Sequence, residues 1–199
     1  MLWSEFFPYV IPYVLGCPYP MAEQHVRLSA IEFCRRTACH QQTLDAETTD
    51  GTTHSVDLSP DAGTVVNKVR SVWVDGRSFP VVEAKRGISL ESSNSEYCFT
   101  QDNKTLQIYP LQIAGIPVVV EVVLVPSITS SSINSLIGGD YLQDIAAGAI
   151  ASLSRVPTFD DPRTAAFFQS QYIARMATVA AKVARGFAAS KMQAHTSFV

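Results

Sequence analysis

Charged side chains are scarce in this sequence of 199 residues. They make up 17% of it, whereas hydrophobic residues make up 47%. Soluble domains usually carry about 25% charged residues. The shortfall indicates either that other chains cover part of the surface or that the hydrophobic core is large, and composition does not decide between the two.

Acidic residues are absent from Arg175 to the last residue. Residues 41–126 carry eleven acids and six bases, a net charge of −5, whereas residues 160–199 carry five bases and two acids, a net charge of +3. A basic tail on an acidic body is typical of contact with nucleic acid or with an acidic partner protein. Four bases in the last 25 residues are too few for a nucleic-acid-binding arm.

Long uninterrupted hydrophobic runs are also missing. The apolar first twenty residues contain four prolines and no basic start, and the apolar run 113–126 contains Glu121. A membrane span needs about 20 apolar residues, and a signal peptide begins with basic residues. We therefore expect no membrane partner and no secretion signal. The cysteines follow no disulfide-scaffold spacing, which predicts buried thiols in a reducing compartment; they are Cys17, Cys34, Cys39 and Cys98.

Motifs of catalysis and of cofactor binding are absent as well. Cys34, Cys39 and His40 form one metal-like group, but a zinc site takes four ligands and no second pair is present. Gly138-Gly139-Asp140 lacks the Lys and the Ser or Thr of a phosphate-binding loop. The sequence therefore predicts a protein that is not an enzyme, with no catalytic residue, no cofactor and no stoichiometric metal.

Aromatic residues and prolines are concentrated at the start of the chain. Prolines favour extended geometry, so we expect residues 1–20 to form an extended aromatic arm. Its apolar side chains must lie against the arm's own domain or against a neighbouring subunit. The arm residues that we expect to contact a partner are Trp3, Phe6, Phe7 and Tyr9.

The middle of the chain has the pattern of strands. Residues 65–74 alternate, and Asp75-Gly76 and Asp102-Asn103 each predict the turn of a hairpin. Residues 118–125 have the composition of a buried strand. Because the connections look local, we expect residues 41–126 to form an antiparallel β module, either one sheet or a small sandwich.

Helical patterns lie on both sides of this module. We expect helices from Pro20 to about Cys39, from about residue 139 to 155, and from Asp160 or Asp161, as the N-cap, to about Gly186. The order predicts an α+β fold, in which residues 21–40 and 136–188 form a helical bundle and residues 41–126 are inserted in it.

The last helix has two adjoining apolar stripes, which indicates more than one neighbour. The neighbours are either helices of other chains or the first two helices of the same bundle. The first stripe is Phe168, Tyr172, Met176, Val179, Val183 and Phe187; the second is Ala166, Ile173, Ala177, Ala180, Ala184 and Ala188.

The end of the chain combines apolar anchors with positive charge. We expect the tail, residues 189–199, to be mobile in the free protein and ordered on a partner, so that deleting residues 188–199 weakens attachment but spares the fold. The partner-binding residues predicted in this half of the chain are Arg175, Lys182, Arg185, Phe187, Lys191, Phe198 and Val199.

The chain resembles the head-to-tail connector (adaptor) proteins of tailed bacteriophages over about residues 8–188. The opening resembles their first helix, with Pro18-x-Pro20 followed by Ala30-x-x-Phe33-Cys34-Arg35-x-Thr37. Further along, Tyr109-Pro110, the small-residue helix of residues 146–153 and the final helix of residues 165–185 also match. Where the family often has a Trp, this chain has Thr158-Phe159.

The resemblance implies a structural virion protein, assembled in the host cytoplasm and located in the neck of the particle. Such adaptors form a ring, usually of twelve copies, which joins the portal protein to the next tail protein and extends the DNA channel. DNA passes through without sequence-specific binding. The alternative from the residues alone is a small cytoplasmic module that binds a ligand or a protein through its β module and is not an enzyme.

Overall fold

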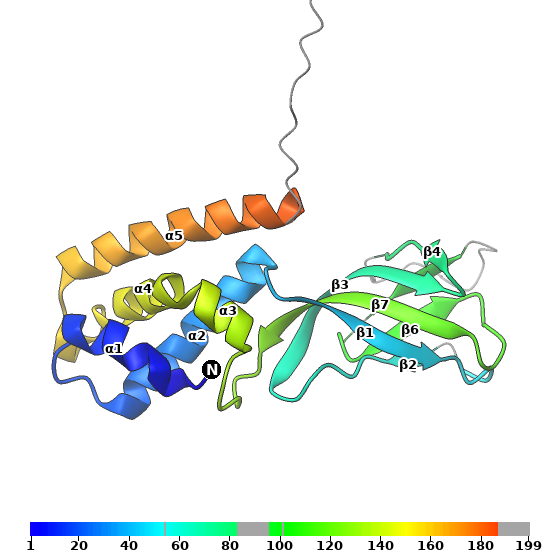
Figure 1. Cartoon of the computed structure of the whole chain (residues 1–199), viewed down its shortest axis with the longest axis horizontal. Coiled ribbons are helices and arrows are strands. Elements are labelled where there is room, and N and C mark those ends of the chain that lie inside the picture. Colours follow the sequence, from blue (N-terminus) through cyan, green and yellow to red (C-terminus); the bar gives the residue numbers. More distant parts are fainter. Residues whose placement is uncertain (54, 83–95, 101, 187–199) are drawn as a thin grey trace, which may run out of the picture. The chain divides into compact units, whose positions relative to one another are not determined.

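The computed structural model describes residues 1–53, 55–82, 96–100 and 102–186, without the side chains of residues 45–48. They form a mixed structure of helices and antiparallel sheets, which confirms the predicted α+β class. The chain divides into two compact units (Figure 1). The β unit comprises Met1–Trp3 and His40–Gly138, and the helical unit comprises Ser4–Cys39 and Gly139–Val199. Within the described part, no helix has both the length and the apolarity needed to cross a membrane.

The β unit contains two antiparallel sheets, as the sequence predicts. The larger has the order β1-β7-β3-β4, and the smaller has the order β2-β6-β5. The bounds are β1 Gln41–Thr48, β2 Ser55–Asp57, β3 Thr64–Val74, β4 Arg77–Phe79, β5 Tyr97–Phe99, β6 Thr105–Tyr109 and β7 Pro117–Pro126.

The expectation that all the strand connections are local is wrong. Strand β7 lies between β1 and β3, although it follows β1 by almost 70 residues. Seven of its ten residues are buried, so it gains more from a central position than from an edge. Both predicted hairpins are confirmed, because β3 pairs with β4 and β5 pairs with β6. Asp75 and Gly76 both have positive φ angles, which a type I′ turn requires.

The helical unit is built on three long helices that pack on one another: α2 (Tyr19–Thr37), α4 (Leu142–Leu153) and α5 (Pro162–Ala184). The predicted helix of residues 139–155 is interrupted at Tyr141, where the backbone leaves the helical region. Gly138-Gly139-Asp140 therefore ends a separate short helix, α3 (Ser135–Asp140).

The extended conformation expected for residues 1–20 is wrong. The segment instead folds into helical turns: η1 (Trp3–Phe6), α1 (Phe7–Val10) and η2 (Ile11–Tyr13). Proline is tolerated in the first turn of a helix, where its missing N–H costs no hydrogen bond. Pro8 and Pro12 occupy such positions in α1 and η2, so these prolines start turns and do not extend the chain.

Helix α5 begins as predicted. Asp161 is its N-cap and accepts hydrogen bonds from the backbone N–H groups of Arg163 and Thr164, both at 3.1 Å. Within the described residues the first stripe is buried, except for the half-buried Phe168. The second stripe is exposed, except for the half-buried Ala180. Packing inside the helical unit therefore uses only one of the two stripes.

Candidate interaction surface

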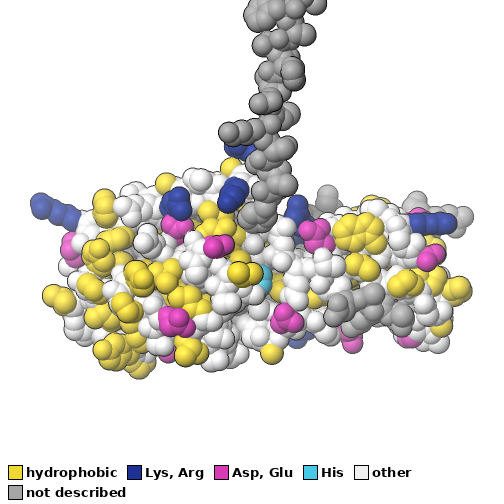
Figure 2. All heavy atoms as spheres, in the orientation of Figure 1, with side chains coloured by type: hydrophobic (Ala, Val, Ile, Leu, Met, Phe, Trp, Pro, Cys, Tyr) yellow, Lys and Arg dark blue, Asp and Glu magenta, His cyan; other side chains and the backbone are white. Residues whose placement is uncertain are grey.

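Large apolar side chains gather on the outside of the helical unit. Figure 2 shows hydrophobic side chains spread over this unit, at the left of the view. They come from the N-terminal turns, from α2 and the residues before it, and from α5, and their exposed fractions lie between 43% and 80%. They are Tyr9, Tyr13, Leu15, Tyr19, Leu28, Phe167 and Ile173.

The aromatic residues predicted for partner binding at the N-terminus divide into two groups. Trp3 and Phe6 are 1% and 0% exposed, and the Trp3 indole N–H donates to the Ser130 carbonyl oxygen at 2.8 Å. These two side chains belong to the hydrophobic core of the chain and cannot cover a neighbour. Phe7 is half-buried and stacks on Tyr19 with ring centroids 5.2 Å apart. Tyr9 is 44% exposed and remains available to a partner.

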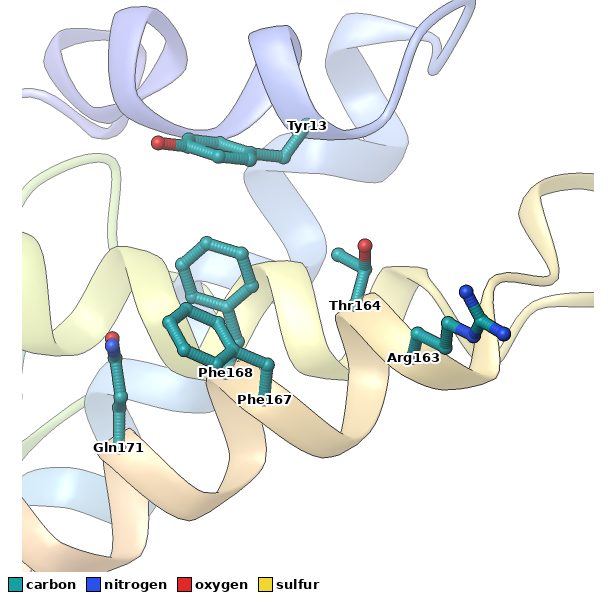
Figure 3. A pocket seen from close by; sticks show the side chains of 6 residues that line it. All are labelled: Tyr13, Arg163, Thr164, Phe167, Phe168 and Gln171. Carbon is teal, nitrogen blue, oxygen red and sulfur yellow. The ribbon is translucent and has the colours of Figure 1, made fainter.

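An aromatic hollow of about 510 Å³ lies between the N-terminal turns and the first half of α5 (Figure 3). The Tyr13 ring meets the Phe168 ring edge-on at 4.9 Å, and Phe168 meets Phe167 edge-on at 5.2 Å. Arg163 and Gln171 lie at opposite ends. The hollow is thus an open surface on which aromatic rings lie beside polar side chains, a mixture typical of contacts with proteins.

Arg175, predicted to contact a partner, already has one inside the helical unit. Its Nε donates to Asp144 Oδ1 at 2.9 Å, and this pair joins α5 to α4. The Asp144 carboxylate, only 11% exposed, raises the pKa of Arg175. Nearby, the Tyr172 hydroxyl donates to the Ser29 carbonyl oxygen at 2.6 Å. Neither contact follows from sequence spacing, since each joins residues of different helices.

The other predicted partner residues of this half of the chain are Lys182 and Arg185, which are exposed, and four residues that lie outside the described part: Phe187, Lys191, Phe198 and Val199. The predicted tail, residues 189–199, lies outside it too. Figure 2 shows Lys and Arg side chains along the upper edge of the helical unit, where Figure 1 places α5.

The four cysteines are free and buried, which confirms the prediction of buried thiols. A hydrogen bond with Cys39 and then burial raise the pKa of Cys34, and burial raises the pKa of Cys98 to about 12. Both thiols are therefore protonated near neutral pH and unreactive. Among the described residues, no group of three or more His, Cys, Asp or Glu is placed to hold a metal ion.

A small polar pocket of about 160 Å³ lies in the β unit, lined among others by His40, Asp61, Thr64 and Asn134. Burial lowers the pKa of His40, whose Nδ1 is buried without a hydrogen-bond partner. The pocket is smaller than the roughly 300–1,000 Å³ of most small-molecule sites. It has room for a few water molecules.

Comparison of the chain with protein-family models and with curated proteins found no match.

Proposed function

We propose that this chain is a structural assembly protein of a tailed bacteriophage: the head-to-tail adaptor that forms a ring between the portal protein and the tail. In the ring, for which the resemblance implies twelve copies, the subunits extend the DNA channel in the neck of the virion. Each subunit contributes its surfaces and no chemistry.

The observation that carries the proposal is the exposed apolar surface of the helical unit. Its own core is already complete, with Phe6, Val26, Phe33 and Ile150 almost fully buried. The aromatic hollow and the second stripe of α5 nevertheless remain outside. The rings of the hollow contact one another at the surface, and large exposed clusters of this kind mark interaction sites. A protein that works by covering neighbours accounts for this surface and for the low content of charge.

The resemblance supplies the kind of neighbour. Adaptors of this family place their helices near the portal and direct the β module outward or toward the tail. The helical unit, which carries the aromatic hollow, is therefore the part proposed to meet the portal and the flanking subunits. The β unit is proposed to meet the next tail protein.

The alternative, a ligand-binding module that uses its β region, has less support. It needs a pocket of ligand size in the β unit, and the polar pocket beside His40 measures about 160 Å³. The larger hollow lies in the helical unit and is open, with aromatic and polar residues side by side. Its form suits a protein side chain better than a small polar molecule.

The proposal predicts binding to the portal ring of the same virus. The purified chain, mixed with that ring, is expected to add about one copy per portal subunit, measured by native mass spectrometry. Replacing Tyr13 and Phe167 with Ser should reduce this binding, whereas replacing the exposed Ile128 of the β unit should not. A chain that never joins the portal ring, or binds equally well without Tyr13 and Phe167, would contradict the proposal.

A further inference from the structure

The polar pocket beside His40 is built from separate segments of the β unit. We name it the His40 pocket; it measures about 160 Å³ and is lined by residues 40, 61–64, 126 and 132–134. His40 stands just before β1, and its carbonyl oxygen accepts a hydrogen bond from the backbone N–H of Leu124 in β7 at 2.8 Å. The backbone N–H of Ser127 donates to the Gly63 carbonyl oxygen, also at 2.8 Å. Backbone hydrogen bonds therefore hold the walls of the pocket in place.

The imidazole ring of His40 lacks a hydrogen bond that burial normally requires. The residue is 7% exposed, and its Nδ1 is buried without a hydrogen-bond partner. Buried polar atoms are rarely left unpaired in folded proteins, because burial removes their water without a replacement. Burial also lowers the pKa of His40, so the ring is neutral near pH 7. A neutral imidazole has one nitrogen that accepts a hydrogen bond, and a ligand with N–H groups would supply the missing donor.

Asp61 gives the pocket a negative charge. Its Oδ2 accepts a hydrogen bond from Gln42 Nε2 at 3.0 Å, but it forms no ion pair with any residue that the structure describes. No Lys or Arg is among the described residues that line the pocket. The charge of Asp61 raises the pKa of His40, against the larger effect of burial, so the two groups lie close enough to contact one ligand. This chemistry favours a cation and disfavours an anion such as phosphate.

The kind of cation follows from the size of the pocket and from the number of groups that line it. A metal ion is disfavoured, because no third His, Cys, Asp or Glu among the described residues joins Asp61 and His40. An ammonium group is more strongly hydrated than a guanidinium and loses more on leaving water. A guanidinium is small and planar, and its N–H groups point in fixed directions toward several acceptors at once. It therefore fits a pocket that combines a carboxylate with an imidazole nitrogen.

We propose that the His40 pocket binds the guanidinium group of an arginine side chain from a partner protein. One N–H of the guanidinium donates to the Asp61 carboxylate, whose Oδ1 is not used by Gln42, and another donates to the ring of His40. The pocket holds only the end of one side chain, so it selects a residue of the partner and does not supply the whole affinity. The inference rests on the proposed function only for the identity of the partner, the tail protein that meets the β unit.

Titration of the full chain with N-acetyl-arginine amide tests the proposal. Proton–nitrogen NMR spectra of the imidazole rings follow His40, and the ring of His25, in the helical unit, is the internal reference. We expect saturable shifts of the His40 ring with half-saturation below about 10 mM, a weak affinity that suits one side-chain end. N-acetyl-citrulline amide has nearly the same shape without the charge, so it should give no saturable shift up to about 50 mM.

Two variants at exposed carboxylates of the β unit separate the pocket from general charge. Asp61→Asn should weaken binding of N-acetyl-arginine amide about tenfold, as expected when a charge-assisted hydrogen bond is lost. Asp57→Asn is the matched control, because Asp57 is exposed on β2 and does not line the pocket. Binding to the unaltered chain should also weaken as the pH falls through the pKa of His40, which burial places below 6.5, because the protonated ring repels the guanidinium.

Three outcomes would overturn the inference: no saturable shift with N-acetyl-arginine amide, an equal response to the citrulline compound, or unchanged affinity in Asp61→Asn. The first would leave the pocket to water alone. Free arginine should bind no more tightly than the capped compound; tighter binding would assign the pocket to a free amino acid and would also overturn the inference. None of these results bears on portal binding, which native mass spectrometry measures separately.

Discussion

Gly148 allows α4 to approach its neighbours in the helical unit closely. A Cβ at this position would come within 2.8 Å of the Tyr172 ring and 3.1 Å of Ser29 Cβ. Tyr172 cannot easily move away, because it is buried and its hydroxyl is hydrogen-bonded to the Ser29 carbonyl oxygen. The small residue is therefore a packing requirement at the crossing of three helices.

Gly148→Ala is expected to destabilise the protein by about 1–3 kcal/mol, the usual cost of overpacking a core. Urea unfolding followed by circular dichroism measures the change. Gly139→Ala is the control, since a Cβ there meets nothing within 4 Å. It should be neutral, or stabilising by up to about 1 kcal/mol through helix propensity. Equal stability of the two variants would show that Tyr172 yields to the added methyl group.

At the scale of elements, the start of α5 depends on a single side chain. Asp161 accepts hydrogen bonds from two backbone N–H groups and from the Thr164 hydroxyl, and these bonds lower the pKa of its carboxyl group. Asp160 precedes it, is exposed, and is not the N-cap. Replacing these two neighbouring carboxylates one at a time therefore distinguishes the effect of the cap from the effect of negative charge near the helix N-terminus.

Asp161→Ala should lower the Tm by roughly 2–4 °C, as expected when a helix cap is lost from a chain of this length. Asp160→Ala removes the same charge one residue earlier and should leave the Tm almost unchanged. Differential scanning calorimetry measures both. A comparable loss in the two variants would mean that charge near the helix N-terminus, and not the cap, stabilises α5.

At the scale of the whole molecule, the N-terminal segment serves both the fold and the surface. Its buried side chains, Phe6 and Val10 among them, complete the helical unit, and its exposed tyrosines form part of the outside. Removing residues 1–13 deletes both kinds at once. That deletion is expected to impair ring formation or solubility, but its effect would not distinguish the buried side chains from the exposed tyrosines.

Single substitutions separate the two roles. Phe6→Ala should cost about 3–5 kcal/mol, the range for a large buried aromatic residue. Tyr9→Ala should change stability by no more than about 0.5 kcal/mol, because Tyr9 lies at the surface. Binding of the Tyr9 variant to the portal ring then reports the contribution of the exposed surface. Unaltered binding would assign the N-terminal segment to folding only.

Local signals in the sequence were sufficient for several features. Asp75-Gly76 predicted the β3–β4 turn, because few residues other than Asp, Asn and Gly tolerate positive φ angles. Asp161 predicted the start of α5, because its side chain bonds N–H groups only two and three residues away. The spacing of Tyr172 and Val179 predicted one apolar stripe of α5, which the structure buries. Each signal depends on residues close together in the chain.

Tertiary structure decided what depends on residues far apart. The place of β7 between β1 and β3, the pairing of Arg175 with Asp144, and the burial of Trp3 each join distant segments. Local composition cannot select these partners, because many other strands or side chains of similar composition could pair with the same segment. The choice depends on how the whole chain folds. The sequence therefore determined most of the strands and long helices and which of their faces are apolar, but not the helical turns of residues 3–13 or the break at Tyr141. Only the tertiary structure decided which apolar faces are buried inside the chain, since each helix face is covered by whichever neighbour the whole fold brings to it.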